Sequence, residues 1–494
     1  MEHLSPLDSA FLDFEDADRH ASLAIASIAV VEGPPPSQSE FVESVRGRLP
    51  LIARYRQKVR QLPLDVGPPV WVEDPAFDLT YHIRRTGLPA PGDDAALCRL
   101  VARLMAQRLD RDRPLWECWV IEGLAGNRWA VLTKVHHCMA DGVSGNALYR
   151  IVFDESPVPR DAVPDTRCHT PEPSTLRLTA DAVADLVGNP LQQIRSLMHA
   201  LHAPQALVRH VADTARGLIE LTGVLMPVSR SPLAGPIGQQ RRYAVGRAAL
   251  QDVVHVAKTF QVTVNDVVLA AVTGAFRTHL LNDGATPDPD AVRTLVPVSM
   301  RTPGDEGVVD NRISVLLPLL PVEHTDPVGR LREVHRRLSA LKESKEAEAG
   351  EAMTELAKHE PFPPLAYGIR LAARLPQRHI VAVTTNVPGP RRPLYVLGRQ
   401  IVEILPYVPI AVRLRTGVAA LTYHGQMSFG VTTDYDTGPD ADLIIDALGD
   451  EIAKLVEAAR AADATARSPK TVATPRRGRA GKRATSPAAA RRSP

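Results

Sequence analysis

The hydrophobic pattern of the first 165 residues predicts a lobe of mixed helices and strands. An almost continuous apolar run at Ala24–Val31 is typical of a buried strand, and Pro34–Pro36 ends it. Segments 38–49 and 94–110 show the apolar spacing of helices. Two apolar runs, Leu115–Ile121 and Trp129–Val135, flank a glycine-containing turn and predict a hairpin. A helix is expected after it, at Val143–Phe153.

The second half of the chain predicts another lobe, reached through a helical connection. Residues 155–175 are rich in Pro and Asp, and residues 176–228 are helical in pattern with few strand signals. Helices are then expected at Leu250–Phe260, Val264–Leu280, Asp326–Ala347 and Asp440–Ala459. Strands are expected at Thr294–Met300, Ile313–Leu320 and Val381–Asn386, and Ala419–Thr432 is expected to carry two strand segments split near His424-Gly425. We therefore divide the chain into an N-terminal lobe (1–165), a helical connection (166–239), a C-terminal lobe (240–460) and a tail (461–494).

The bulk composition supports two domains and names no partner. A chain of 494 residues fits two domains of roughly 200 residues each. Its net charge is only +2, so overall charge does not indicate nucleic acid or an acidic surface. Cys98, Cys118, Cys138 and Cys168 form no CxxC pair, which fits a reducing cytoplasmic compartment. We see no secretory start and no run of 18 apolar residues, so any membrane contact is expected to be peripheral.

The tail differs in composition from the rest of the chain. Between residues 463 and 494 there are nine Lys or Arg and one acidic residue, set among Ala, Thr, Ser and Pro. Such a segment cannot bury a core, so disorder is expected. It lacks interleaved aromatics, which argues against nucleic acid as a partner. A solvated extension and an attachment to an anionic membrane or lipid-droplet surface both remain open.

The segment His136-His-Cys-Met-Ala-Asp-Gly142 carries the strongest chemical signal. It ends an apolar strand, and an imidazole can take a proton from a hydroxyl or thiol near neutral pH. If the strand continues through the pair, His136 and His137 point to opposite faces, so only one is expected in a given site. Alternation alone does not choose between them. Asp141 can shape the turn, and Gly142 permits backbone angles that other residues avoid.

Two other uses of this segment are weaker. A metal site is disfavoured because consecutive histidines on a strand point apart and no carboxylate-histidine spacing accompanies them. A serine-nucleophile elbow at Ser144 fails because Asn146 stands where that motif needs glycine. Elsewhere, Asn265-Asp266 fits either a helix cap or a site contribution, and Asn386-Val-Pro-Gly-Pro390 fits a turn after a strand.

Several motifs together resemble the bacterial wax ester synthase/acyl-CoA:diacylglycerol acyltransferase family, in particular triacylglycerol synthases of the mycobacterial type. They occur in the family's order and cover nearly all of residues 1–455: Pro6-Leu-Asp-Ser-Ala-Phe-Leu12, Pro114-Leu-Trp116, His136-His-x-x-x-Asp-Gly142, Asn265-Asp266, Val296-Pro-Val-Ser-Met-Arg301, Asp310-Asn-Arg312 and Asn386-Val-Pro-Gly-Pro390. The histidine motif alone is shared by a wider superfamily of CoA-dependent acyltransferases. The ordered set is more specific, and the basic tail lies outside it.

The resemblance implies the two-lobed α/β fold of chloramphenicol acetyltransferase-like enzymes, with a tunnel between the lobes. By position in the motif, His137 would be the general base, with His136 supporting it, Asp141 holding the turn through an Arg, and Gly142 forming the turn. Asn265 would position substrate or stabilise the oxyanion. Asn311, Arg312 and Asn386 are candidate substrate-binding residues. No metal and no resident cofactor are implied, because acyl-CoA is a substrate.

The function that the resemblance implies is transfer of a long-chain acyl group from acyl-CoA to diacylglycerol, with fatty alcohols as second acceptors. The expected location is cytoplasmic, at the periphery of a membrane or lipid droplet. Two alternatives stay open. One is another acyltransferase of the same superfamily, of the condensation or polyketide-associated kind. The other is a lipid-binding protein with an inactive site.

Overall fold

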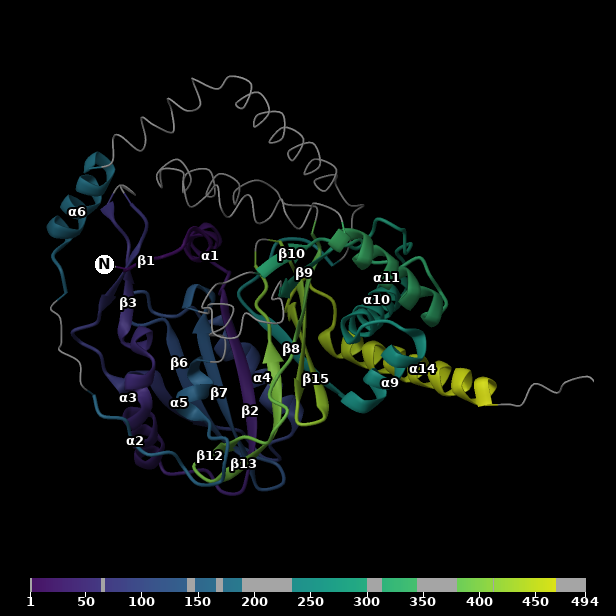
Figure 1. The fold of residues 1–494 in the computed structure, drawn as a ribbon, viewed down its shortest axis with the longest axis horizontal. Helices are drawn as coiled ribbons and strands as arrows, with labels where there is room; N and C mark the ends of the chain where they lie inside the picture. Colours follow the sequence, from purple (N-terminus) through teal and green to yellow (C-terminus); the bar gives the residue numbers. More distant parts are fainter. Residues whose placement is uncertain are drawn as a thin grey trace, which may run out of the picture.

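The computed structural model describes residues 2–63, 67–139, 147–165, 172–188, 233–299, 313–343, 380–411 and 413–467. Figure 1 shows two lobes side by side, one built mainly from the purple and blue N-terminal half and one from the teal, green and yellow C-terminal half. Each lobe contains a mixed sheet and its helices. The two-lobed α/β architecture expected from the sequence is therefore present.

The first lobe is organised by a six-stranded sheet in the order β12-β13-β2-β7-β6-β5. Its neighbours are antiparallel except β5 and β6, which are parallel and are connected through helix α4 (Asp94–Ala106). Strand β7 is central, and all but its first residue are buried. This burial on both faces explains why apolar residues occupy consecutive positions from Trp129 to Leu132. The strands are β2 (Ala24–Glu32), β5 (Ile83–Gly87), β6 (Trp116–Leu124), β7 (Arg128–His136), β12 (Tyr395–Val396) and β13 (Arg399–Tyr407).

Short helices and a small sheet complete this lobe. Helix α1 (Pro6–Ala17) begins at Ser5, whose side chain accepts the Asp8 N–H. Helix α2 (Gln38–Arg48) begins with a capping box between Ser37 and Glu40. The remaining described elements are β1 (Glu2–His3), β3 (Gln57–Arg60), β4 (Val70–Glu73), α3 (Leu79–His82), α5 (Ala147–Val152), α6 (Thr175–Gly188) and the 3₁₀ turns Leu49–Leu51, Ala53–Arg56 and His137–Met139.

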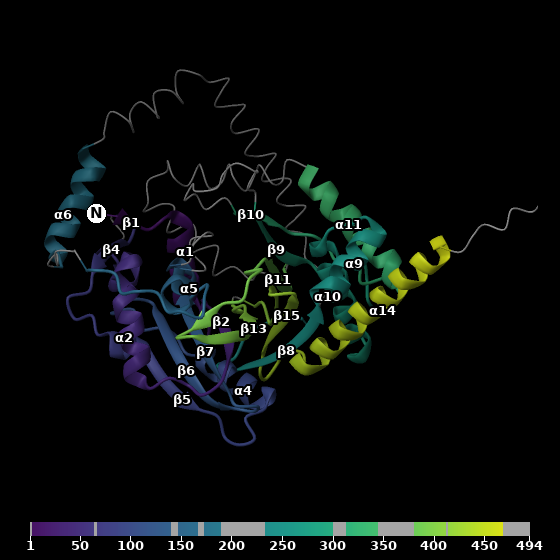
Figure 2. The ribbon, with the colours of Figure 1, turned by 60° about the horizontal axis from the view of Figure 1, so that its bottom comes forward.

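The second lobe contains a six-stranded sheet in the order β10-β9-β11-β14-β15-β8. Figures 1 and 2 show its helices grouped on the side away from the first lobe. Apolar residues of the helices and the strands form one core. The strands are β8 (Arg241–Ala249), β9 (Thr294–Ser299), β10 (Ile313–Leu316), β11 (Ala382–Val387), β14 (Thr416–Tyr423) and β15 (Gln426–Asp434), and the helices are α9 (Leu250–Phe260), α10 (Val264–Asn282), α11 (Pro327–Glu343) and α14 (Ala441–Arg467).

Strand β13 belongs by sequence to the second half but lies in the first sheet, paired antiparallel with β2. Figure 2 shows the yellow-green β13 beside the purple β2. The sequence division assigned residues 395–407 to the C-terminal lobe, so the two lobes are not consecutive blocks of chain. No strand was predicted at Ile401–Tyr407, and the apolar residues there carry no signal for the sheet that the strand joins.

Close contacts hold β13 against the second sheet. The Tyr243 hydroxyl on β8 donates to the Pro406 carbonyl at 2.8 Å. A Cβ at Gly430 on β15 would lie 2.0 Å from the same oxygen, so this approach requires glycine. Arg247 donates to both carboxylate oxygens of Glu403, at 2.6 and 2.9 Å. These contacts join the lobes near their middle.

A buried lysine joins β7 to α4. The Lys134 ammonium donates to the Leu104 carbonyl at 2.9 Å and to the Gln107 carbonyl at 2.5 Å, at the C-terminal end of α4. Burial lowers the pKa of Lys134 to about 8. A cation is favourable at this end of a helix, where carbonyl groups lack partners within the helix. The strand that leads to the histidine pair is thereby attached to α4.

The predicted elements named above are present within the described residues, with shifted ends. Three differences are informative. Helix α1 and strand β8 were not predicted, because polar residues interrupt the apolar pattern of each. Helix α14 continues to Arg467, past the predicted start of the tail at 461. The remainder of the tail and most of the predicted helical connection lie outside the described residues. In the described part of the chain, no single helix is long and apolar enough to cross a membrane, although α9 and α10, bent by 101° at their junction, pass that test as a pair.

We predict that Glu403→Gln destabilises the protein by about 1–3 kcal/mol, because it removes the charge from a hydrogen-bonded pair that joins the lobes. The Glu403 side chain is 8% exposed and Arg247 is 38% exposed, which tempers the loss. Urea unfolding would measure it. Arg46→Gln, in an exposed pair on α2, is the control and should change stability by less than about 0.5 kcal/mol. Equal effects would show that the Glu403 pair does not hold the lobes together.

Candidate active site

The histidine pair lies where β7 ends. His136 is the last residue of the strand, and His137 begins a 3₁₀ turn that ends at Met139. The His137 N–H donates to the Leu23 carbonyl at 3.0 Å, next to the start of β2. The strand therefore does not continue through the pair, and the expectation of two side chains on opposite faces of one strand does not apply. The turn, not the pleat, sets the direction of His137.

His136 is a buried wall residue whose tautomer is fixed by its neighbours. The Cys138 N–H donates to its Nδ1 at 3.2 Å, so Nδ1 carries no proton in the neutral ring. The proton then resides on Nε2, which lies 3.5 Å from the Glu15 carboxylate. Burial lowers the pKa of His136, which keeps the ring neutral. Through the bond from Cys138, His136 supports the turn, while its supporting role in catalysis stays a prediction.

Glu15 is the site residue that the sequence analysis missed. Its carboxylate accepts the Leu23 N–H at 2.9 Å and a hydrogen from Arg111 at 2.5 Å, in addition to facing His136. Burial alone would raise the pKa of Glu15, but His136, Arg111 and the Leu23 N–H hold it at about 2. A lone acid in the amphipathic start of the chain gave no sign of a partner 121 residues later, at His136. Only the fold brings them together.

His137 is held by an aromatic stack and by burial. Its ring stacks on Phe11 of α1, with ring centroids 4.0 Å apart and planes inclined by 24°. Burial, with a smaller contribution from His136, lowers the pKa of His137 to about 4. Its Nδ1 is buried and makes no hydrogen bond to any other described residue. The ring is thus neutral at physiological pH and free to accept a proton, which is the state a general base needs.

The stack places His137 at the junction of the lobes. Phe11 and Phe14 of α1 pack on a cluster that contains Ala21 and Leu23 from the first lobe. The cluster also includes Ile237, just before β8, and Ile410 and Ala411, just after β13. The motif residue Phe11 therefore orients the imidazole and also seals the junction. This arrangement agrees with a site between lobes.

Cys138 has the position of a nucleophile but not its chemistry. Its Sγ lies 3.0 Å from His136 Nδ1, which suggests a Cys–His pair. Burial, however, raises the pKa of the Cys138 thiol well above its usual range, and the residue is only 3% exposed. The thiolate, not the thiol, is the nucleophile. The geometry therefore favours a base rather than a covalent cysteine.

Asn265 and Asn386 come together in the second lobe. Asn386, at the end of β11, donates through Nδ2 to Asn265 Oδ1 at 3.4 Å. The cap of α10 is made by Thr263 and Asp266, which form a reciprocal capping box, and Asp266 also accepts from His335 at 2.8 Å. Asn265 therefore does not cap the helix, and Asp266 is structural. Within the described chain, neither amide hydrogen-bonds to the histidine pair.

Four predicted site residues lie outside the described residues: Asp141, Gly142, Asn311 and Arg312. Their roles remain predictions from the sequence. The turn that precedes Asp141 is described as far as Met139.

We predict that Glu15→Gln lowers the free energy of unfolding at pH 7 by about 3 kcal/mol. The carboxyl titrates near 4.5 when unfolded and at about 2 when folded, and one pKa unit corresponds to about 1.4 kcal/mol. This stability is complete above about pH 5 and is lost as the pH falls from 4.5 toward 2. Chemical unfolding across that range would show it. In the variant, stability should depend less on pH, whereas the exposed control Glu43→Gln should behave like the wild type.

Comparison with known proteins identifies the family. The wax ester synthase/diacylglycerol acyltransferase catalytic domain matches residues 4–268, and the corresponding C-terminal domain matches residues 309–456. The chain is 44% identical over 459 residues to a probable diacylglycerol O-acyltransferase, tgs1, of Mycobacterium tuberculosis H37Rv, and the match covers 92% of this chain and 96% of that protein. A putative diacylglycerol O-acyltransferase of Mycobacterium bovis matches equally well.

Solved structures agree with this assignment. The wax ester synthase/diacylglycerol acyltransferase of Marinobacter aquaeolei VT8 is 26% identical, with a TM-score of 0.62 over 93% of this chain and all of that one. The first condensation domain of the calcium-dependent antibiotic synthetase has a TM-score of 0.56 at 15% identity, covers 93% of this chain and 96% of that domain, and shares the fold alone. The chain therefore belongs to the wax ester synthase/diacylglycerol acyltransferase family and is an acyltransferase.

Proposed function

We propose that this enzyme transfers a long-chain acyl group from acyl-CoA to the free hydroxyl of diacylglycerol, forming triacylglycerol, and that fatty alcohols serve as second acceptors to give wax esters. Acyl-CoA acts as a substrate, and no resident cofactor takes part. The observation that carries the proposal is the neutral imidazole of His137, held at the lobe junction in a chain of this family.

The proposed reaction is a direct transfer. His137 accepts the proton of the acceptor hydroxyl while that oxygen attacks the thioester carbonyl. The carbon–sulfur bond then breaks, and the leaving CoA sulfur takes the proton back from the imidazolium. No acyl-enzyme is needed, in keeping with the protonated thiol of Cys138.

Asn265 is the proposed oxyanion donor. Its Oδ1 is occupied by Asn386, so its amide NH₂ group remains available to donate. Such a donor typically contributes about 10²–10³ in rate. Asp141 is proposed to hold the turn after His137, and Asn311 and Arg312 remain proposed contacts for substrate.

The test is product formation. Purified protein is incubated with palmitoyl-CoA and either diacylglycerol or hexadecanol, and the neutral lipids are resolved while thiol release is followed. Triacylglycerol is the expected product with diacylglycerol. Thiol release only with a carrier-protein thioester would favour a condensation-type enzyme, and no release with any thioester would favour a lipid-binding protein.

We predict that His137→Ala lowers turnover by at least about 10², because the general base is lost. His136→Ala should lower turnover less and stability more, since His136 is buried between Cys138 and Glu15. Turnover and urea unfolding of both variants would be compared. An inactive His136 variant beside an active His137 variant would reverse the two assignments.

The basic tail is proposed to attach the enzyme to an anionic membrane or lipid-droplet surface. Because α14 is helical to Arg467, a truncation belongs after that residue. We predict that the truncated enzyme keeps its activity on dispersed substrate and sediments less with phosphatidylglycerol vesicles at low salt. The difference should shrink at about 0.5 M salt, since charges are already screened within about 10 Å at 0.1 M. Equal sedimentation of both forms would contradict the attachment.

A further inference from the structure

His82 is a buried titratable residue that the proposed reaction does not use. It ends helix α3, and its exposed fraction is 0%. Its ring lies between two aromatic rings: Trp116, with centroids 4.6 Å apart and planes inclined by 12°, and Phe77, at 5.2 Å and 18°. Burial lowers the pKa of His82, so the ring is neutral at physiological pH. A neutral imidazole has a single N–H, and its position decides which group the ring can bind.

The N–H of the His82 ring is on Nδ1. This atom lies 2.8 Å from the main-chain carbonyl oxygen of Trp116, which can only accept. Nε2 therefore carries no proton, and it is buried without a hydrogen bond to any other described residue. The Trp116 indole N–H donates to the Tyr55 carbonyl at 2.8 Å. The side chain and the main chain of Trp116 are thus both held in place, and His82 contacts both.

The hydrogen bond from His82 completes the sheet at the start of strand β6. The Leu115 carbonyl faces β7, because it accepts the His136 N–H at 2.9 Å. Main-chain groups alternate in direction along an antiparallel strand, so the Trp116 carbonyl faces the other neighbour, β5. The N–H of Ile83, the first residue of β5, donates back into α3. The side chain of His82 therefore supplies the donor that binds this carbonyl.

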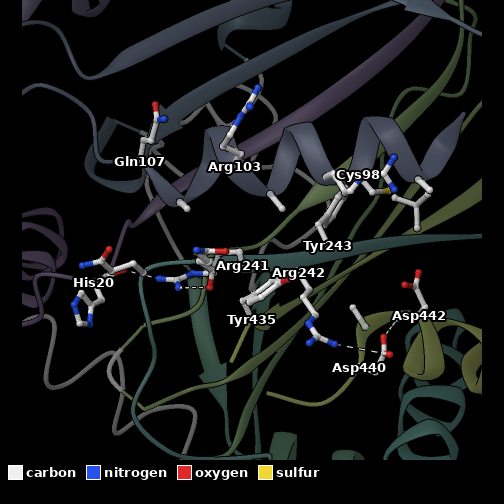
Figure 3. A pocket seen from close by; sticks show the side chains of 18 of the residues that line it. His20, Cys98, Arg103, Gln107, Arg241, Arg242, Tyr243, Tyr435, Asp440 and Asp442 are labelled. Carbon is white, nitrogen blue, oxygen red and sulfur yellow. Dashed lines mark hydrogen bonds and ion pairs between the residues drawn. The ribbon is translucent and has the colours of Figure 1, made fainter. Parts of the chain in front are cut away.

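His82 and Trp116 act on the site without contacting a ligand. Both have an exposed fraction of 0%. Neither is among the described residues that line the groove between the lobes, which Figure 3 shows with α4 along one wall and Tyr243 of β8 along the other. Their connection to the site is the main chain, because Leu115 precedes Trp116 and binds the N–H of His136.

We propose that His82 is a positioning residue for His137 and acts through the start of strand β6. The inference rests on the proposed function of His137 as the general base. Without an N–H at position 82, the buried Trp116 carbonyl loses its donor, and the start of β6 shifts to find another partner. The Leu115 carbonyl then moves with it, and so does the His136 N–H. A misplacement of about 1 Å at a reacting group can cost about 10² in rate.

Two variants separate the hydrogen bond from the stack. His82→Phe keeps a flat ring between Phe77 and Trp116 but removes the donor, whereas His82→Asn removes the ring and places an amide N–H near the position of Nδ1. We expect kcat to fall at least about tenfold in His82→Phe, with KM unchanged. His82→Asn should be the more active of the two variants. A rise in KM alone, or a lower kcat in His82→Asn than in His82→Phe, would overturn the proposal.

The second lobe offers a matched control. His279 on α10 is also buried, with an exposed fraction of 8%, and its Nε2 likewise makes no hydrogen bond to a described residue. His279→Phe therefore makes the same substitution in a different core, and kcat should equal that of the wild type. Urea unfolding of each variant fixes conditions in which kcat is measured on folded protein. Equal losses of kcat in the two Phe variants would mean general destabilisation and would also overturn the proposal.

The orientation of the His137 ring is measured independently of turnover. In protein that contains histidine labelled with carbon-13, the His137 resonance is identified by its loss in His137→Ala. Because the ring stacks on Phe11, its proton shift reports the ring current of that neighbour. His82→Phe should move this resonance and His279→Phe should not; an unmoved resonance in His82→Phe would contradict the positioning role. A moved resonance, beside a wild type that forms no triacylglycerol, would support that role and count against the proposed function alone.

Discussion

The buried carboxylate of Glu15 is the interaction on which the site depends. A charge in a protein interior is tolerated only when several partners compensate it. Glu15 meets this demand with the Leu23 N–H, the Arg111 guanidinium and the His136 ring. These partners come from the entry to β2, the segment after α4 and the end of β7. Satisfying one charge therefore positions α1, and with it the Phe11 ring that stacks on His137.

Two features that the proposed mechanism requires are set by separate means. The imidazole of His137 is kept neutral by burial, not by a carboxylate at its own nitrogen, so its charge state does not depend on Glu15 directly. Its direction comes from the 3₁₀ turn and the stack. Across the junction, Asn386 donates to Asn265 Oδ1, which orients the Asn265 amide and leaves its NH₂ group available to donate. Preorganised groups of this kind need little rearrangement during reaction, which is the main source of electrostatic catalysis.

The hydrophobic pattern along the chain was sufficient to predict many of the helices and strands. The ordered set of motifs was sufficient to predict the family. The strand that ends at His136 and the helix that begins after Thr263 follow from periodicity and caps. Long-range pairing could not be predicted: strand β13 itself was not predicted, and nothing in its sequence indicates β2 as its partner. The role of Glu15 was missed for the same reason, because the partners of a carboxylate are known only once the fold places them beside it. The choice between cap and site at Asn265 needed side-chain geometry, which showed that Thr263 and Asp266 already form the cap.

The placement of β13 also has a consequence for synthesis. The edge of β2 that pairs with β13 has no partner until residue 407 has left the ribosome, 271 residues after His136 at the end of β7. At about 5–20 residues per second this interval lasts roughly 15–55 s. During that time the nascent chain presents an apolar strand with open main-chain hydrogen-bonding groups, which is the kind of edge that pairs with other chains. The order of strands thus leaves the N-terminal half with an open sheet edge until the C-terminal half arrives to complete its sheet.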